Sequence, residues 1–298
     1  MDWDKLRIFY AVAKAESFTH AGDTLNLSQS AVSRQISALE GSLNVSLFHR
    51  HARGLKLTEQ GVHLFRTVKD VYNKLTMTEA QIIESKERPQ GPLKITTTVA
   101  FGSVWLTPRM KEFLEHYPDI EVSLVLSDSD LDLSMGEADA AIKMGAPTQP
   151  DLIQRNIMPI GFNVFASPQY LKANGIPEKP EDMDDHKLIV YGEDVWAPVA
   201  NLNWLLDAGA TPENPRQAVL RVNSVYGIYR AVQSGIGIGA LPDYMSHQLA
   251  NANLVQVLSE LKGPNFDAYF VYPEELRNSK RIEVFRDFLL RRIAEDGN

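Results

Sequence analysis

The chain has 298 residues, of which 44% are hydrophobic and 23% charged, and its formal net charge is −8. This composition is typical of a globular protein with room for two or three domains. The absence of cysteine excludes disulfides, thiolate nucleophiles and zinc ribbons. No apolar run approaches the roughly 18 residues of a membrane span, and the acidic start lacks the pattern of a secretory signal. We therefore expect a cytoplasmic protein with no membrane partner.

The first sixty residues predict three short helices. Apolar residues recur at helical spacing over residues 4–15, and Ser17 can cap a second helix over residues 18–24. Leu25-Asn26-Leu27 forms the turn, and Ser28 can cap a third helix that runs to about Leu43. Small residues in the second helix, Ala21 and Gly22, allow another helix to cross closely. The third helix gathers its apolar residues on one face, namely Ala31, Val32, Ile36, Leu39 and Leu43.

The opposite face of the third helix is polar and cationic, with Gln29, Ser30, Ser33, Arg34 and Ser37. Gln can contact adenine, Arg can contact guanine, and Ser can contact base edges or phosphates. A merely solvated face would be richer in Glu and Lys. From residue 28 to residue 56 four cations stand against one anion, 4 − 1 = +3, although the whole chain is acidic. This segment therefore predicts an interface with duplex DNA.

Residues 45–58 predict two short extended segments joined by a cationic tip, Arg50–Gly54. This is typical of a wing whose cations reach phosphates or the minor groove. His49 and His51 could form half of a metal site, but no further ligand follows at a usable spacing, so we expect no metal and no other cofactor. The residues expected to contact DNA are Ser28, Gln29, Ser30, Ser33, Arg34, Gln35, Arg50, Arg53 and Lys56.

This region resembles the winged helix-turn-helix of LysR-type transcriptional regulators. The resemblance rests on Ser17-Phe18-Thr19, residues 27–36, Leu39-Glu40, Leu47-Phe48 and Leu57-Thr58-Glu59-Gln60-Gly61. Gly22 is one departure, because the family more often has alanine there. The resemblance implies a sequence-specific regulator that controls promoters in response to a small-molecule effector, with RNA polymerase as a further partner.

A long helix is predicted from Thr58 to about Glu87, followed by a hinge at residues 88–92. Its apolar residues recur in a heptad pattern, which favours a dimer seam. The alternative is a helix packed on its own domain. LysR-type proteins dimerise through this helix, so the resemblance supports a homodimer, which we expect to pair into a homotetramer. The seam residues are Leu64, Val68, Val71, Leu75 and Ile82.

From residue 93 strands alternate with helices, which predicts an α/β region. We expect strands at residues 93–98, 120–127, 138–144 and 163–166, and helices at residues 101–117, 168–173, 226–233 and 280–292, the first interrupted by Pro108. Three segments, residues 117–122, 136–142 and 231–242, resemble the sensor half of LysR-type proteins. The resemblance implies a periplasmic-binding-protein type II-like effector domain of two α/β subdomains behind the winged N-terminal domain. The expected domains are 1–58, the linker helix 59–88, and the effector domain 93–298, with subdomain I at 93–161 and 268–298 and subdomain II at 162–267.

The run Gly235-x-Gly237-x-Gly239 could indicate a nucleotide-binding loop. It follows a helix and enters a strand, however, whereas a phosphate loop runs from strand to helix. We therefore interpret it as a structural turn.

In this fold a ligand lies between the subdomains, held by helix N-termini, hydroxyls and amides. The expected effector contacts are Thr98, Val99, Ala100, Phe101, Ala146, Asn203, Asn223 and Ser224, with Met144, Gly145, Asn201 and Trp204 as further candidates. No Arg or Lys is clearly placed for a carboxylate, and we expect a small organic acid or amino acid held by backbone N–H groups and hydroxyls. No catalytic constellation is present, so we expect no enzyme activity. The alternative function is a constitutive, architectural DNA-binding protein whose regulatory half serves oligomerisation only.

Overall fold

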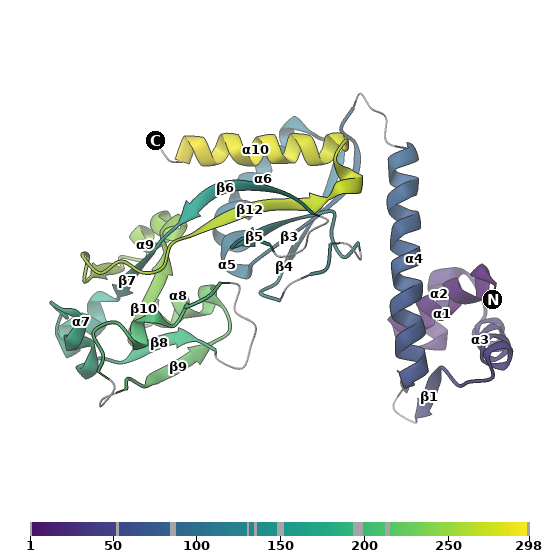
Figure 1. Cartoon of the computed structure of the whole chain (residues 1–298), viewed down its shortest axis with the longest axis horizontal. Helices are drawn as coiled ribbons and strands as arrows, with labels where there is room; N and C mark the ends of the chain where they lie inside the picture. Colours follow the sequence, from purple (N-terminus) through teal and green to yellow (C-terminus); the bar gives the residue numbers. More distant parts are fainter. Residues whose placement is uncertain are drawn as a thin grey trace. The chain divides into compact units, whose positions relative to one another are not determined.

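The computed structural model describes residues 2–51, 54–83, 88–129, 131–133, 136–147, 152–192, 199–211 and 215–296. The chain divides into two compact units (Figure 1). One comprises Met1–Ile83 and Met135–Glu137, and the other comprises Glu84–Ser134 and Ala138–Asn298.

The N-terminal unit consists of helices α1 (Trp3–Ala15), α2 (Phe18–Leu25) and α3 (Gln29–Leu43), a hairpin and a long helix. The hairpin strands are β1 (Phe48–His51) and β2 (Gly54–Leu57), and helix α4 spans Glu59–Ile83. The three predicted helices and the two extended segments of the wing are thus confirmed. Asp2, Ser17 and Ser28 cap the first three helices through their side chains.

The core of this unit lies between the three short helices, the hairpin and the start of α4. Phe9, Val12, Val32, Ile36 and Leu39 are completely buried. The hairpin is tied to α3 by Glu40, whose Oε1 accepts hydrogen bonds from the backbone N–H groups of Leu47 (2.7 Å) and Phe48 (3.3 Å). These contacts fix the wing relative to the exposed face of α3.

The first sheet of the second unit has the order β4-β3-β5-β12-β6. Its strands are β3 (Gly91–Thr97), β4 (Ile120–Leu126), β5 (Ala140–Met144), β6 (Leu152–Ile160) and β12 (Phe266–Pro273). Strand β3 is parallel to β4 and β5, whereas β12 is antiparallel to β5 and β6. Strand β3 begins two residues before the prediction, so Gly91 and Pro92 of the expected hinge belong to the sheet.

The helical segment that follows β3 begins earlier than predicted. It runs as α5 (Val99–Phe101), a π-helical turn (Gly102–Leu106) and α6 (Thr107–His116). Pro108 lies in the first turn of α6, directly after the π-helical turn, so the α-helical geometry is interrupted close to the predicted position. The C-terminal helix α10 (Lys280–Asp296) packs Phe285 against Phe113 of α6.

The second sheet has the order β11-β7-β10-β8-β9. Its strands are β7 (Phe162–Ala166), β8 (Leu188–Tyr191), β9 (Ala218–Val222), β10 (Ile238–Pro242) and β11 (Val255–Val257). Its helices are α7 (Pro168–Asn174), α8 (Val225–Gln233) and α9 (Ser246–Asn251), with short 3-10 turns at Pro180–Asp185, Trp204–Leu206 and Asp243–Met245. Two mixed sheets with covering helices confirm the predicted α/β fold class.

The chain passes from the first sheet to the second at Gly161, between β6 and β7. The N–H of Gly161 donates to Oδ2 of Asp243 (2.9 Å), and its carbonyl accepts from the N–H of Asp243 (3.0 Å). A Cβ at position 161 would lie 2.9 Å from Oδ1 of Asn265, on the segment that returns to β12. The two connections therefore lie side by side.

The glycine-rich run is a close-packed turn between α8 and β10. Gly235 has φ +80°, a Cβ on Gly237 would lie 2.2 Å from the carbonyl oxygen of Lys187, and one on Gly239 would lie 2.8 Å from Val232. These contacts require glycine for backbone conformation and close approach, which confirms the structural interpretation.

Candidate nucleic-acid interface and ligand cavity

Helices α2 and α3 form a helix-turn-helix whose tight turn depends on Gly22. A Cβ at this position would lie 2.6 Å from the carbonyl oxygen of Leu27, which is a clash with backbone. Asn26 adopts the left-handed conformation (φ +55°) that ends α2. The departure from alanine at residue 22 is therefore required by this turn, and it fixes where α3 begins.

Helix α3 presents most of its polar residues outward, opposite an apolar face whose central residues are buried. Val32, Ile36 and Leu39 are completely buried. Gln29, Ser30, Arg34, Gln35 and Ser37 are exposed, and Ser33 is half-buried. Among the described residues, no acidic side chain lies within ion-pair distance of Arg34. The outward face can therefore offer its donors and its charge to a partner.

Ser28 has a structural task as well as its predicted DNA contact. Its Oγ accepts a hydrogen bond from the N–H of Ala31 (3.2 Å) and lies 3.1 Å from Oγ of Ser30. Ser28 is exposed, so a partner can still approach it. The first turn of α3 also carries the positive end of the helix dipole, which favours a phosphate nearby.

The wing places Lys56 on β2 opposite His49 on β1, and Lys56 is exposed. Arg50 lies on β1 opposite Leu55. Arg53, at the predicted cationic tip, lies outside the described residues. Of the predicted wing cations, the structure thus places the side chain of Lys56 alone.

The predicted dimer seam on α4 divides into two parts. Val68 is 2% exposed and Leu64 packs against the same core cluster, so these two residues stabilise their own domain. Tyr10 of α1 stacks on Phe65 (5.5 Å between ring centroids) and on Tyr72 (5.1 Å) of α4. For Leu64 and Val68 the prediction of a free seam is corrected, because the N-terminal half of α4 is already covered by α1.

Further along α4, Val71 and Leu75 remain accessible, with exposed fractions of 42% and 51%. The side chain of Ile82 lies outside the described part of the chain. Exposed branched residues one turn apart are available for burial against another helix. The accessible part of the predicted seam thus begins at Val71.

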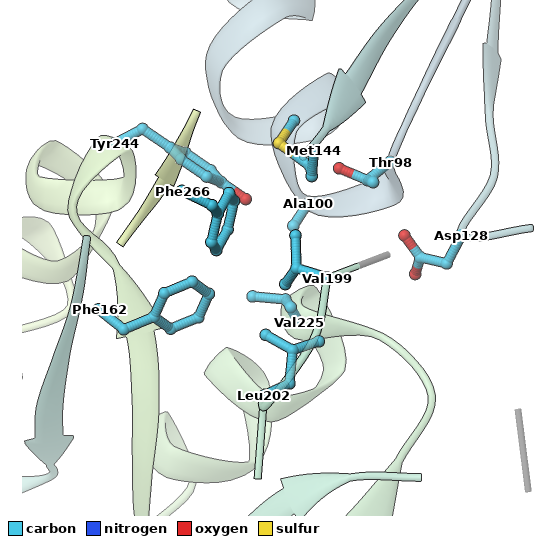
Figure 2. Close-up of a pocket in the computed structure, with 10 residues that line it drawn as sticks. All are labelled: Thr98, Ala100, Asp128, Met144, Phe162, Val199, Leu202, Val225, Tyr244 and Phe266. Carbon is cyan, nitrogen blue, oxygen red and sulfur yellow. The ribbon is translucent and has the colours of Figure 1, made fainter. Parts of the chain in front are cut away.

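The second unit contains a cavity of about 320 Å³, including its part open to solvent, between elements of the two sheets (Figure 2). Its lining is mostly apolar, with two polar side chains and one tyrosine hydroxyl. The ten lining residues are Thr98, Ala100, Asp128, Met144, Phe162, Val199, Leu202, Val225, Tyr244 and Phe266. A concave apolar site with a few polar groups is typical of small-molecule binding.

Three of the predicted effector candidates, Thr98, Ala100 and Met144, line this cavity. Val99 does not, and its N–H donates to Oδ1 of Asp128 (3.0 Å). Phe101 is completely buried and packs between Trp105 (5.0 Å between centroids) and Tyr244 (5.2 Å). Phe101 is therefore a core residue.

Four other predicted contacts lie away from the lining. The side-chain amide of Asn203 is hydrogen-bonded to the backbone of strand β8. Its Oδ1 accepts from the N–H of Tyr191 (2.8 Å), and its Nδ2 donates to the carbonyl of Tyr191 (3.1 Å). Asn223 and Ala146 are exposed. The Oγ of Ser224 is buried without a hydrogen-bond partner among the described residues, one position before Val225. Only Asn203 is engaged with local backbone, and contact of the other three with an effector stays a prediction.

The other seven lining residues, which occur in the sequence between positions 128 and 266, were not among the predicted contacts. Two of them could have been found, because Phe162 and Phe266 directly follow Gly161 and Asn265, where the chain passes between the sheets. Val225 also directly follows Asn223 and Ser224, two of the predicted effector contacts. The others come from loops and turns whose meeting depends on the tertiary fold.

Burial raises the pKa values of two tyrosines that also feel the charge of Asp128. It raises the pKa of Tyr191 to about 12, and the negative charge of Asp128 adds to the effect. Burial and then the charge of Asp128 also raise the pKa of Tyr244 far above its ordinary value. The Tyr244 hydroxyl therefore stays protonated, and an anion is already present at the other end of the site.

No group of three or more His, Cys, Asp or Glu side chains that could hold a metal occurs among the described residues. In the same part of the chain, none of the helices has the length and apolar character needed to cross a membrane.

Comparison with known proteins agrees with both halves of the molecule. Residues 3–62 match the family model "Bacterial regulatory helix-turn-helix protein, lysR family", and residues 86–294 match the LysR substrate binding domain. The regulator CrgA of Neisseria meningitidis is 32% identical over 99% of this chain and 97% of its own length.

Solved structures show the same relationship. The structure of CrgA matches with a TM-score of 0.62 at 29% identity, covering 98% of this chain and 99% of that one. Full-length AphB, a virulence activator of Vibrio cholerae, matches with a TM-score of 0.63 at 28% identity over 97% of this chain and 99% of its own. The chain belongs to the LysR family of transcriptional regulators, with a helix-turn-helix domain followed by a substrate-binding domain.

Proposed function

We propose that this LysR-type regulator reads promoter DNA through the outward face of α3 and changes its DNA binding when a small molecule occupies the cavity. The observation that carries the proposal is the division of α3 into an apolar face, with Val32, Ile36 and Leu39 completely buried, and a largely exposed polar face. A helix held this rigidly can place its outer side chains in a major groove with little loss of conformational entropy on binding.

Base readout is assigned to Arg34, Gln29 and Gln35, which are all exposed. Arg forms two parallel hydrogen bonds with guanine, and Gln does so with adenine. Ser30 and Ser33 suit base edges or phosphates nearby. Contacts of this kind distinguish one base pair from another, whereas a charge alone does not.

The wing supplies the sequence-independent part of binding. Lys56 is exposed on β2, and Arg50 and Arg53 precede it in the sequence. Each cation that neutralises a phosphate releases counterions, so affinity falls as salt is added. The wing therefore sets strength and register while α3 sets specificity.

Dimerisation is assigned to the part of α4 from Val71 onward, where Val71 and Leu75 are exposed. A two-fold dimer reads two half-sites about 34 Å apart, one helical turn of DNA. Burying a charge at the seam opposes association, so Leu75→Glu should produce monomers in sedimentation. Val62→Glu is the matched control, because Val62 is also exposed on α4 but precedes the seam. Monomerisation by both variants, or by neither, contradicts this assignment.

The cavity supports effector control over the constitutive alternative, because an oligomerisation module has no need of an open, partly polar site. A ligand acts only if it binds one arrangement of the protein more tightly than another. We propose that dimers pair into tetramers through the effector units, and that ligand binding alters the spacing of the bound half-sites and hence the contact with RNA polymerase.

The test begins by selecting duplexes from a random-sequence pool with the full-length protein. Enrichment of one roughly palindromic sequence, and loss of this preference in Arg34→Ala, supports base readout by α3. Equal binding to selected and unselected duplexes contradicts it, as does a preference that Arg34→Ala leaves unchanged.

A further inference from the structure

The two ends of the cavity differ in chemistry. Figure 2 shows the rings of Phe162, Phe266 and Tyr244 at one end and the carboxylate of Asp128 beside Thr98 at the other. The rings of Phe162 and Phe266 lie 5.8 Å apart between centroids at an angle of 44°. An occupant that fills the cavity must therefore offer an apolar part to the rings and a group that tolerates a negative charge to Asp128.

Asp128 is held in place by backbone geometry. It follows the end of β4, where the N–H of Ser127 donates to the carbonyl of Thr97 (2.9 Å). Ser127 and Ser129 close the next turn, with the N–H of Ser129 donating to Oγ of Ser127 (3.1 Å). Oδ1 of Asp128 then accepts the N–H of Val99 at the start of the helical segment. The chain's own carboxylate thus occupies the place where a helix N-terminus would otherwise attract an anionic ligand.

No positive charge balances Asp128 from the lining. None of the described lining residues is Lys, Arg or His. The loop-containing segments 117–142 and 192–215, which supply Asp128, Val199 and Leu202, contain no Lys, Arg or His in the sequence. Lys143 precedes Met144 on β5, so strand alternation places it on the opposite face of the sheet. An entering carboxylate would therefore meet repulsion without a counter-charge.

We propose that the cavity binds an organic ammonium ion with an apolar, preferably aromatic body: the ammonium donates to Asp128 and Thr98, and the body packs on Phe162, Phe266 and Tyr244. A charge-assisted hydrogen bond is stronger than a neutral one, and aromatic faces also attract cations.

This inference rests on the proposed function and takes the place of the small organic acid or amino acid expected from the sequence. A single ring with a short arm is an appropriate probe, because it is a small molecule that joins an aromatic body to an ammonium group.

The experiment uses the full-length protein and three probes that share a phenyl ring and a two-carbon arm: 2-phenylethylammonium, 2-phenylethanol and 3-phenylpropanoate. Calorimetric titration should give an ammonium Kd lower by about tenfold or more than that of either other probe. Asp128→Asn keeps an acceptor for the N–H of Val99 but removes the charge. It should raise the ammonium Kd by about tenfold and leave the alcohol Kd within about twofold.

Asp119→Asn is the matched control. It removes the same charge from an exposed position at the opposite end of β4, and it should leave all three Kd values unchanged. The unchanged alcohol Kd reports that the Asp128→Asn cavity is still folded.

The inference is overturned if the carboxylate or the alcohol binds as tightly as the ammonium. It is also overturned if Asp128→Asn leaves ammonium binding unchanged, or if no probe binds at millimolar concentration. Binding of the selected duplex, measured on the same preparations, separates the two claims. Intact DNA binding with no charge preference refutes only the ligand class, whereas absent DNA binding refutes the proposed function.

Discussion

The outward face of α3 and the cavity of the second unit, residues 84–134 and 138–298, bring their functional residues together in different ways. In α3 the functional residues are neighbours in sequence, exposed, and held by an apolar face behind them. In the cavity they come from residues 98 to 266, and most are apolar. The first site depends on local helix geometry and the second on the packing of whole sheets, so substitutions should affect them through different quantities.

The largest expected effect is on the stability of the effector unit. Phe101→Ala should lower its free energy of unfolding by about 3–5 kcal/mol, because Phe101 is completely buried against Trp105 and Tyr244. Hydrogen exchange of the β3 amides measures this. Leu114→Ala, at a residue 43% exposed on α6, is the control and should change stability by less than about 0.5 kcal/mol. A loss of stability as small as that of the control would contradict the assignment of Phe101 to the core.

Two glycine substitutions distinguish a closely packed position from an open one within the N-terminal unit. Gly61→Ala should destabilise it by about 1–3 kcal/mol, because the new Cβ would lie 2.1 Å from the backbone oxygen of Leu47. Gly41→Ala on α3 meets nothing within 4 Å and should stabilise the unit by roughly 0.5–1 kcal/mol. Chemical denaturation of both variants measures the difference. If both changes shift stability in the same direction, the close contact between Gly61 of α4 and the backbone of Leu47 is contradicted.

Arg34→Ala should leave stability unchanged and reduce binding of the selected duplex by about 1–3 kcal/mol, with little loss on unrelated duplexes. The reason is that Arg34 is exposed and packs against nothing in the core. Competition assays on the two duplex types measure the ratio. Lys111→Ala, which removes an exposed charge from α6, should change neither affinity.

The smallest expected effect is at the wing. Lys56→Ala should weaken binding to all duplexes alike and reduce the slope of log affinity against log salt by about 0.9, the loss of one phosphate contact. Affinities measured at several salt concentrations give the slope. A sequence-dependent loss would instead place Lys56 at a base edge.

The same contrast explains what could be predicted from the sequence. The helices of the N-terminal unit and the face of α3 follow from spacing and capping, which are local. Strands β8 and β12 were missed because they are buried on both faces and show no alternation. Asn203 looked like a ligand contact, but the fold uses its amide on the backbone of Tyr191. Asp128 gave no signal, because its position beside the helix start exists only once β3 and β4 pair.

The most direct test of the account is a footprint of the full-length protein on its selected duplex, recorded with and without saturating 2-phenylethylammonium. We predict that the amine changes the protected region of the wild type, that Asp128→Asn needs about tenfold more amine for the same change, and that both proteins bind the duplex. Identical wild-type footprints with and without the bound amine would contradict the claim that occupation of the cavity controls DNA binding.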